Sequence, residues 1–385
     1  MGWPAASAMR LARPRLARRI DHHRSAIGAI GRSRGRGMRD SGQPMALSIA
    51  LAPSDQTPDL IALAEELGIH RAWVYDSPAI FADIWMTLGL AAARTSRIGL
   101  GSLIIASLRH PMVTAAAVAQ LESLAPGRVA LAAGAGFSAR FALGDPKPMK
   151  WADVEEYVVA LRHLLRGEQA TWQGRVLRML HDEGYVAARP LEVPILVAGK
   201  GPKGMAVAAA AGDGICRDAD SLDDETLTHP WVTLHGYALA LRDGESLLDP
   251  RVFETMAWLP ALYHHASYER DLPYEGLPNG VEWRRRLEAV PEHLRHLAVH
   301  DRHMQSLNAL DEGLVTPEIV AEKIPHLAIV GTVDEVAQGL QHFADRGADE
   351  MMMYVPLAHA ERTLRDLAEA AAGVTGPRAL HRARR

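Results

Sequence analysis

Short apolar runs alternate with helical segments along most of this chain, and no other feature of the sequence limits its possible folds as strongly. The clearest unit is residues 194–213, in which Ile195, Leu196 and Val197 form an apolar run typical of a strand buried on both faces. Pro202 suits the first position of a helix, and residues 205–211 are strong helix formers. Between them lie three glycines that permit a tight turn, Gly199, Gly201 and Gly204.

The same pattern recurs before and after this unit. It predicts further strands at residues 45–53, 71–75, 98–105, 129–133 and 351–355, and helices at 58–67, 84–93, 111–127, 151–165, 332–344 and 360–372. Thr171, Trp172 and Val176 predict a small hairpin. Residues 218–326 are less regular, and they predict a strand at 254–262 and helices at 280–290 and 292–308.

Strand and helix pairs joined by short turns indicate a parallel sheet covered by helices, because parallel neighbours need a crossover connection. An open doubly wound sheet and a closed barrel both satisfy the pattern. Seven or eight units within about 330 residues favour the barrel. We therefore predict an α/β fold, a (β/α)8 TIM barrel with insertions, whose active site lies at the carboxyl ends of its strands.

Charge is unevenly distributed along the chain. Residues 1–44 contain ten Arg and two Asp, a net charge of +8, whereas the remaining residues carry 32 basic and 44 acidic groups. This acidic body, without a folded basic face, argues against a nucleic-acid partner. No apolar run of about 18 residues indicates a membrane span, and the single Cys216 excludes an intramolecular disulfide and a cysteine-based zinc cage. A cytoplasmic location is expected.

Composition divides the chain into three parts. Residues 1–44 have few aromatic or β-branched residues and are predicted to be a disordered extension, or upstream sequence with Met45 as the true start. Their Arg-rich, acid-poor composition is also similar to that of a mitochondrial presequence. Residues 45–372 are predicted to form the barrel domain, and residues 373–385 a basic disordered tail.

Two glycine loops follow predicted strands, at residues 134–139 and 199–204, and both match the dinucleotide-binding pattern G-x-G-x-x-G/A. Asp218 and Asp220 follow the second loop by about 20 residues, as in a Rossmann fold. A Rossmann domain, however, carries this pattern in its first strand-to-helix turn, whereas several units precede either loop here. The loops are interpreted as phosphate sites on one rim of a barrel, with Lys200 and Lys203 adding positive charge. The alternative is that the glycines serve only tight turns.

Other polar residues follow the second and third predicted strands or gather on later helices. Asp76 ends the second strand, and the basic pair Arg109 and His110 follows the third, where a solvated turn is the simplest interpretation. Four histidines share one face of the helix predicted at 292–308, and three interpretations compete for them: a solvated face, an acid–base or substrate-contacting role for His300 or His303, and a zinc site. These four are His293, His296, His300 and His303.

Four segments, in this order and spacing, resemble the bacterial-luciferase-like superfamily, and within it the coenzyme F420-dependent, methylenetetrahydromethanopterin reductase-like group. They are WVYDSPAIFADIWMTLGLAAARTSRIGLGSLII, SLRHPMVTAAAVAQLESLAPGRVALAAGAGF, PILVAGKGPKGMAVAAAAGDGI and GTVDEVAQGLQHFADRGADEMMMYVP. The resemblance covers residues 45–372. It implies a luciferase-like TIM barrel that binds a deazaflavin or flavin, coenzyme F420 in preference to FMN, and usually forms a homodimer.

The resemblance also implies individual site residues. Asp76 matches the acidic residue after strand two, and Ser102 and Leu103 match the third strand, where relatives often carry a non-proline cis peptide behind the cofactor ring. We therefore expect a cis peptide at Ser102–Leu103. Gly134 and Gly136 match the loop beside the cofactor. The phosphate loop is matched by Gly199, Lys200, Gly201 and Pro202.

Two departures from the family pattern affect the expected chemistry. Ser77 stands where several deazaflavin-dependent dehydrogenases have His, and Phe137 stands where sugar-phosphate dehydrogenases of the group have Glu. The acid–base pair suited to alcohol oxidation is therefore missing, and Asp76 and His303 are the candidate catalytic residues. We expect an F420-dependent oxidoreductase that moves a hydride between the deazaflavin and a small organic substrate, without a metal. The alternatives are an FMN-dependent monooxygenase and a non-catalytic flavin-binding protein.

Overall fold

The computed structural model describes residues 45–145 and 147–375. The predictions for residues 1–44, and for the tail from residue 376, fall outside these ranges. Eight parallel strands form a closed barrel in the order β1-β12-β9-β8-β7-β4-β3-β2. They are β1 (Ala46–Leu51), β2 (Arg71–Tyr75), β3 (Gly99–Ile105), β4 (Val129–Gly134), β7 (Ile195–Ala198), β8 (Gly214–Asp218), β9 (Val232–Gly236) and β12 (Glu350–Tyr354). The predicted barrel is confirmed, and the open doubly wound sheet and the Rossmann alternative are wrong.

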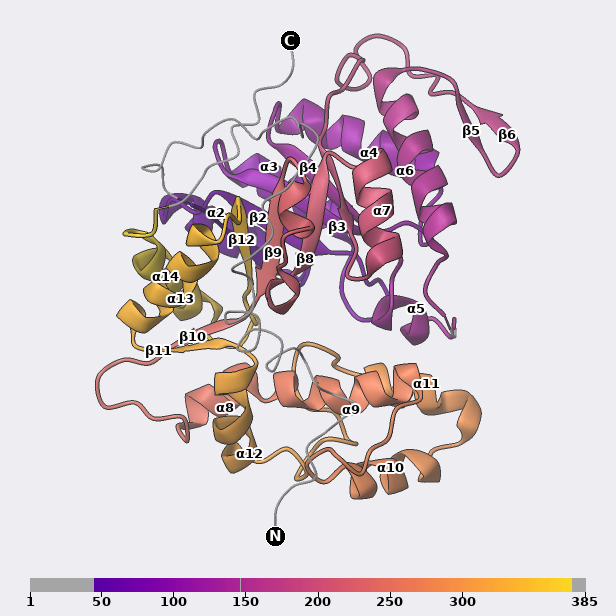
Figure 1. The fold of residues 1–385 in the computed structure, drawn as a ribbon. Coiled ribbons are helices and arrows are strands. Elements are labelled where there is room, and N and C mark those ends of the chain that lie inside the picture. The colour runs from indigo at the N-terminus through magenta and orange to yellow at the C-terminus, as the bar shows by residue number, and fades with distance from the viewer. Residues whose placement is uncertain (1–44, 146, 376–385) are drawn as a thin grey trace, which may run out of the picture.

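Helices cover the outside of the barrel. They are α2 (Thr57–Glu66), α3 (Ile84–Arg94), α4 (Pro111–Leu124), α6 (Trp151–Arg166), α7 (Pro202–Ala211), α13 (Val333–Asp345) and α14 (Ala360–Ala371). The short α5 (Ser138–Ala142) follows β4 and lies at the end of the barrel (Figure 1). Thr332 caps α13 and exchanges hydrogen bonds with Glu335, the reciprocal pattern of a capping box. The predicted hairpin forms as the antiparallel pair β5 (Ala170–Trp172) and β6 (Arg175–Leu177). Two short 3-10 helices, Ala219–Ser221 and Thr226–Thr228, replace a crossover α-helix between β8 and β9.

A second group of helices forms a lobe between β9 and β12. It contains α8 (Pro250–Met256), α9 (Trp258–Arg270), α10 (Gly280–Ala289), α11 (Arg295–His300) and α12 (Pro317–Lys323). Figure 1 shows this lobe, in orange, as a layer beside the barrel. The chain enters the lobe after β10 (Ala238–Ala240) and leaves it at β11 (Ile329–Gly331), and these two short strands pair with each other in parallel. The lobe thus begins and ends at one place.

The predictions inside this lobe are partly wrong. Residues 254–262 form the end of α8 and the start of α9, not a strand. Their β-branched and aromatic residues are buried on several sides between packed helices, where tertiary packing outweighs β propensity. The helix predicted at 292–308 is also wrong in extent, because a 3-10 turn at Glu292–Leu294 precedes α11 and the helix ends at His300. The helix predicted at 280–290 is confirmed as α10.

The barrel interior is closed by a polar plug near the amino ends of the strands. Glu350, 1% exposed, accepts hydrogen bonds from the indole nitrogens of Trp73 (2.9 Å) and Trp231 (3.1 Å) and from the hydroxyl of Ser48. The guanidinium of Arg71 lies against both indole rings, and its Nε is 3.9 Å from the Glu350 carboxylate. This buried charge is therefore paired and hydrogen-bonded, as burial requires.

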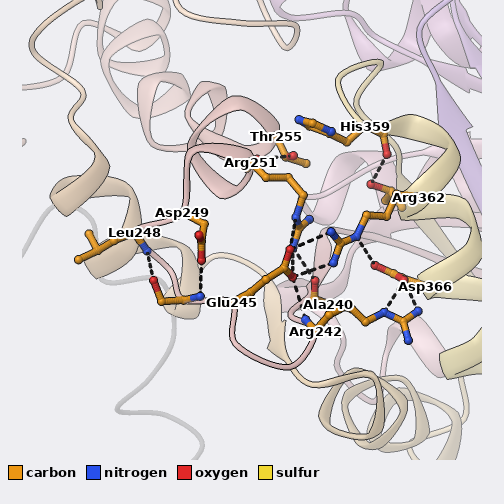
Figure 2. Close-up of polar contacts among 12 residues, drawn as sticks. Ala240, Arg242, Glu245, Leu248, Asp249, Arg251, Thr255, His359, Arg362 and Asp366 are labelled. Atoms are coloured by element: carbon orange, nitrogen blue, oxygen red, sulfur yellow. Dashed lines mark hydrogen bonds and ion pairs between the residues drawn. The ribbon is translucent and has the colours of Figure 1, made fainter.

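An ion-pair network fastens the start of the lobe to the barrel's last helix. Glu245 lies between two guanidinium groups, with Arg251 Nη2 at 2.8 Å and Arg362 Nη2 at 2.7 Å (Figure 2). Arg242 bonds Asp366 and reaches Glu369 at 2.8 Å. Desolvation alone would raise the pKa of Glu245, but the hydrogen bonds from Arg251 and Arg362 lower it to about 2. The network holds the segment before α8 against α14.

Within the described residues, no helix is both long enough and apolar enough to cross a bilayer.

Candidate functional site

The side chains that point into the barrel can be identified from the packing of each strand. Ala132, Leu196, Cys216 and Met352 belong to one interior cluster, whereas their neighbours in sequence pack between the sheet and the helices. Since side chains alternate along a strand, the inward residues at the carboxyl ends follow directly. They are Tyr75, Leu103, Gly134, Ala198, Asp218, His235 and Tyr354. We call this set the barrel mouth.

The barrel mouth has an aromatic, polar side. The Tyr75 hydroxyl lies 3.0 Å from His235 Nε2, and the other ring nitrogen of His235 is 3.9 Å from the Asp218 carboxylate. The Tyr75 and Tyr354 rings are 5.6 Å apart. Burial raises the pKa of Tyr75 well above its usual value and lowers that of His235 despite Asp218. Both groups are therefore neutral near pH 7 and available for hydrogen bonding.

Gly201, at the amino end of α7, is the open position of the second glycine loop. A Cβ built on Gly199 would lie 2.7 Å from the backbone of Gly204, and one on Gly204 would lie 2.7 Å from the Trp151 ring. These two glycines are required by close packing. A Cβ on Gly201 would meet nothing within 4 Å, and no side chain caps α7. Only at Gly201 does the loop leave space for a ligand beside free N–H groups, while Pro202 starts the helix.

Lys200 does not add free positive charge to this loop. Its ammonium group is 2.7 Å from Asp218 Oδ2 and 3.7 Å from Asp220 Oδ1. Desolvation would raise the pKa of Asp218, but Lys200 and His235 lower it. The backbone carbonyl of Lys200 also accepts a hydrogen bond from Arg217 at 2.7 Å. Lys200 therefore connects the α7 loop to the end of β8.

Asp76 forms an ion-pair cluster at the rim, outside the ring of inward side chains. Asp76 is 2% exposed and 3.3 Å from Arg109 Nη2, which also lies 2.8 Å from Asp83. Burial raises the pKa of Asp76, and Arg109 opposes this shift. The solvated turn expected at Arg109 and His110 is wrong, because Arg109 is mostly buried and His110 Nδ1 accepts a bond from the first turn of α4. Whether Asp76 takes part in catalysis stays a prediction.

Ser102 and Leu103 lie on opposite faces of β3. Leu103 packs with the interior cluster, whereas Ser102 shares its face with Leu100 and Ile104, which pack against the helices. The Ser102 hydroxyl is buried without a hydrogen-bond partner. The cis peptide expected at Ser102–Leu103 is wrong, because within the described residues the one cis bond precedes Pro190. Both residues pair regularly with β2 and β4, which keeps an extended trans backbone.

The first glycine loop also divides into two roles. Gly134 ends β4, and a Cβ there would make an ordinary 3.5 Å contact with Ala198, so the position tolerates a small side chain. Gly136 has φ of +69°, and a Cβ there would lie 2.5 Å from Ile105. Its glycine is thus required by backbone conformation and by packing. Gly134 has no side chain and Ala198 has only a methyl group. Little side-chain volume therefore fills this side of the barrel mouth, which lies opposite the aromatic side.

His303 lies in the lobe, next to the barrel mouth. It follows α11 and is 5% exposed, and the carbonyl of its neighbour Met304 accepts a hydrogen bond from the Tyr354 hydroxyl. His300 is 4% exposed and stacks on Phe141 of α5. The solvated histidine face is therefore wrong for both residues, and the break after His300 removes the shared helical face. Within the described ranges, no group of three or more His, Cys, Asp or Glu could hold a metal ion.

Comparison with known protein families identifies the family to which this barrel belongs. Residues 28–227 match the family model described as luciferase-like monooxygenase, which covers more than half of the chain. The chain belongs to this family.

Two kinds of relative within the luciferase-like family are similar to this chain. The F420-dependent glucose-6-phosphate dehydrogenase of Kineococcus radiotolerans is 29% identical over 345 residues, which cover 82% of this chain and 92% of that protein. The coenzyme F420-dependent tetrahydromethanopterin reductase of Methanopyrus kandleri superposes with a TM-score of 0.59 at 17% identity, over 84% of this chain and 97% of its own. A monooxygenase from Streptomyces bottropensis gives 0.53 at 21% identity, over 85% and 98%. The two structures show a shared fold.

Sequence reasoning missed most of the luciferase-like barrel's inward residues. Tyr75 immediately precedes the predicted Asp76, and Tyr354 lies on a strand whose apolar run does not show which residues point inward. In β8 and β9 the inward positions Asp218, Thr233 and His235 are polar, so the apolar run that announces a strand is broken. Polar residues placed two apart between apolar ones were the available signal.

Proposed function

We propose that this protein is an F420-dependent oxidoreductase that transfers a hydride between the deazaflavin and a small organic substrate at the barrel mouth. The observation that carries this proposal is the open Gly201 position at the start of α7, on a barrel rim of the luciferase-like family. The similarity to an F420-dependent dehydrogenase along 82% of the chain supports the choice of cofactor. The alternative within the same family is FMN.

The residues present fit a long cofactor with an anionic end and a planar ring. The uncapped first turn of α7 offers N–H groups beside Gly201, which suits a phosphate. Gly134 and Ala198 contribute almost no side-chain volume on the inner face between this turn and the aromatic side. Lys203 is exposed and makes no ion pair with another described residue, so it can add positive charge at the phosphate end, unlike Lys200.

When bound, the deazaflavin would accept or donate the hydride, and the protein's residues would control its surroundings. Tyr75 and His235 form a neutral hydrogen-bonding pair beside the inner face, and Leu103 supplies an apolar contact. Trp258 of α9 packs against Tyr354 and Tyr237, so the lobe shields this side from water. A shielded site favours hydride transfer over exchange with solvent.

A binding titration tests the cofactor assignment. The protein is mixed separately with F420 and with FMN, and quenching of cofactor fluorescence is followed. We expect saturable binding of F420 that is at least about tenfold tighter than that of FMN, a difference of about 1.4 kcal/mol. Binding of neither cofactor would overturn the proposal.

An FMN-dependent monooxygenase is the second candidate, because the family model and the Streptomyces bottropensis structure both carry that name. Oxygen consumption separates the two functions. A monooxygenase supplied with reduced FMN consumes oxygen, whereas the F420-dependent enzyme with reduced F420 does not. The homodimer and the cytoplasmic location remain predictions, the first measurable by light scattering.

A further inference from the structure

Three buried side chains form a continuous hydrogen-bonded chain inside the lobe. Asp311 Oδ2 lies 3.2 Å from His265 Nε2, and His265 Nδ1 lies 2.9 Å from His303 Nδ1. Asp311, His265 and His303 are 0%, 2% and 5% exposed, respectively. His265 comes from α9, and the other two come from the segment between α11 and α12. We call these residues the histidine relay.

The partners of Asp311 determine where the protons lie. Trp283 Nε1 donates to Asp311 Oδ1 at 2.8 Å, and the backbone N–H of Asn308 donates to Oδ2 at 3.2 Å. Asp311 therefore acts as an ionised acceptor. The side-chain amide of Asn308 lies 3.5 Å from His265 Nε2, but its two hydrogens are directed to the closer carbonyls of Val299 (3.1 Å) and Asp301 (3.3 Å). The proton between His265 and Asp311 thus belongs to His265 Nε2.

The position of the proton on His265 determines the position of the proton on His303. With its proton on Nε2, neutral His265 has a lone pair on Nδ1, so His303 must donate from its own Nδ1. Neutral His303 then carries its lone pair on Nε2. That atom has no hydrogen-bond partner among the described residues, so its lone pair is available to accept a proton. The relay ends in an unprotonated nitrogen.

The backbone holds this base beside the barrel mouth. Arg302 and Met304, on either side of His303, have φ of 52° and 60°, a left-handed conformation that non-glycine residues rarely adopt. The Met304 carbonyl accepts from the Tyr354 hydroxyl, and the Gln305 amide donates to the carbonyl of Ile80, in the loop after β2, at 3.1 Å. Local strain of this kind persists where surrounding contacts over-determine it, and it is frequent at functional sites.

We propose that His303 is the catalytic base of this enzyme and that His265 and Asp311 are positioning residues that hold its tautomer and take up its proton. His303 Nε2 accepts the proton of a substrate hydroxyl, and a bound deazaflavin would take up the hydride from the carbon that bears this hydroxyl. The Nδ1 proton of His303 moves to His265 Nδ1, and the positive charge rests on His265 beside the Asp311 carboxylate. This role deepens the proposed function and depends on it, and it supplies the base that the residues after β2 and β4 lack.

The charges around the relay agree with this direction of transfer. Desolvation, with further contributions from His265 and His300, lowers the pKa of His303 well below its usual value, so this ring does not keep the proton. Desolvation would raise the pKa of Asp311, but the hydrogen bonds from His265 and Trp283 lower it. On the neighbouring face, His300 Nε2 lies 3.0 Å from Glu269 of α9, a separate buried pair. His265 is thus the ring with a carboxylate partner in the relay.

Nitrogen NMR of the full protein labelled with ¹⁵N-histidine tests the relay without substrate or cofactor. His303→Gln identifies the resonances of His303 by difference. At pH 8 we expect His303 to be protonated on Nδ1 alone and His265 on Nε2 alone. On acidification both rings should change in one coupled transition, in which His265 becomes doubly protonated and His303 gains its Nε2 proton. Independent titration of the two rings, or a His303 protonated on Nε2 at pH 8, would overturn the proposal.

Two variants separate the relay from general packing. Asp311→Asn removes the charge that stabilises protonated His265, so the coupled transition should move to lower pH. His264→Gln is the matched control, since His264 is equally buried and stacks on Trp283 but bonds the Pro278 carbonyl outside the relay. It should leave the transition in place. If Asp311→Asn does not fold, Trp283→Phe, which removes one donor to Asp311, should move the transition to higher pH; no movement would contradict the relay.

Steady-state kinetics test the catalytic use of the relay with F420 and a panel of alcohols. His303→Gln should lower kcat about 100-fold with little change in KM, as expected for loss of a general base. The acidic limb of the kcat profile should follow the NMR transition and move with it in Asp311→Asn. Equal losses in all variants with an unchanged pH profile would reduce the relay to a structural role. A coupled transition in a protein that binds no F420 would instead contradict the proposed function and leave the relay standing.

Discussion

The two ends of the barrel treat polar groups in opposite ways. At the amino ends of the strands, Glu350 is surrounded by Ser48, Trp73, Trp231 and Arg71, and its charge is fully used inside the protein. At the carboxyl ends, the space beside Gly201 is open, and in the adjoining lobe the Nε2 atom of His303 has no hydrogen-bond partner among the described residues. Buried polar groups that are satisfied contribute to folding, whereas open ones are available to a ligand. The difference distinguishes polar groups that are satisfied inside the protein from those that we propose for a ligand.

Removal of the Glu350 carboxylate at the amino ends of the strands tests this comparison with the largest expected effect. Glu350→Ala leaves two buried indole N–H groups and a hydroxyl without their acceptor and the Arg71 guanidinium without its counter-ion, and we expect a loss of about 3 to 5 kcal/mol in the free energy of unfolding. Urea denaturation measures it. Exposed Glu66→Ala on α2 is the control and should stay within about 0.5 kcal/mol of the parent. A loss below about 1 kcal/mol in Glu350→Ala would show that the plug is not structural.

The matching change at the open end should affect binding instead of folding. Gly201→Leu places a side chain in the space beside the first turn of α7, and we expect cofactor affinity to fall about 100-fold, or about 2.7 kcal/mol, with unchanged stability. Gly89→Leu on α3 is the control, because a Cβ there also meets nothing within 4 Å. Fluorescence titration gives both affinities. Unchanged affinity in Gly201→Leu would remove the phosphate assignment.

The ion-pair network of Glu245 extends the comparison outside the barrel. Like Glu350, Glu245 is a carboxylate paired inside the protein, but its side chain is less buried. Glu245→Gln should cost about 2 kcal/mol at pH 7, since two charge-assisted hydrogen bonds are weakened. The pKa of Glu245 is lowered in the folded protein, so its contribution is complete above the unfolded carboxyl pKa of about 4.3 and is lost as pH falls toward 2.

Urea denaturation at a series of pH values between 7 and 2.5 checks this dependence. The difference between Glu245→Gln and the parent should shrink steadily below about pH 5. Glu369→Gln, at the exposed edge of the same network, should cost less than about 0.5 kcal/mol. A constant difference across the whole pH range would contradict the electrostatic explanation.

The smallest expected effects come from removing one hydroxyl at each end. Ser48→Ala deletes a donor to buried Glu350 and should cost about 1.5 kcal/mol of stability. Tyr75→Phe deletes the partner of His235 at the barrel mouth, where both side chains are less buried than Glu350, and should cost about 0.5 kcal/mol. Thermal or urea unfolding of the two variants under identical conditions ranks them. The reverse order would mean that the mouth is as tightly built as the plug.

Sequence predicted the fold well where strands are continuously apolar. The elements from residue 45 to residue 211 and those after residue 331 were confirmed, because buried parallel strands and glycine turns have a strong local signature. β8 and β9 were missed since polar inward residues interrupt their apolar runs. Residues 254–262 were misassigned because a helix buried on several sides has no polar face, and short apolar runs of this kind do not distinguish helix from strand.

The site was harder to predict, because its phase and its long-range contacts are not local properties. Asp76, Ser102 and Leu103 were named from the family resemblance, and of these only Leu103 points inward, whereas the inward neighbour of Asp76, Tyr75, was not named. In a strand buried on both faces, no alternation reveals which residues point inward. His303 was singled out from helical spacing that the structure does not have, and its partners His265 and Asp311 are 38 and 8 positions away in sequence.

The pairing of β10 with β11 has a consequence for how enzymes of this shape can diversify. The chain enters the lobe from β10 and leaves it into β11, and these two strands pair with each other in parallel. Residues 241–328 are therefore an insertion whose two ends lie side by side. Exchanging such an insertion leaves every barrel strand and its register in place. A single recombination event within residues 241–328 could therefore replace the helices beside the barrel mouth, the histidine relay included, without interrupting a strand of the barrel.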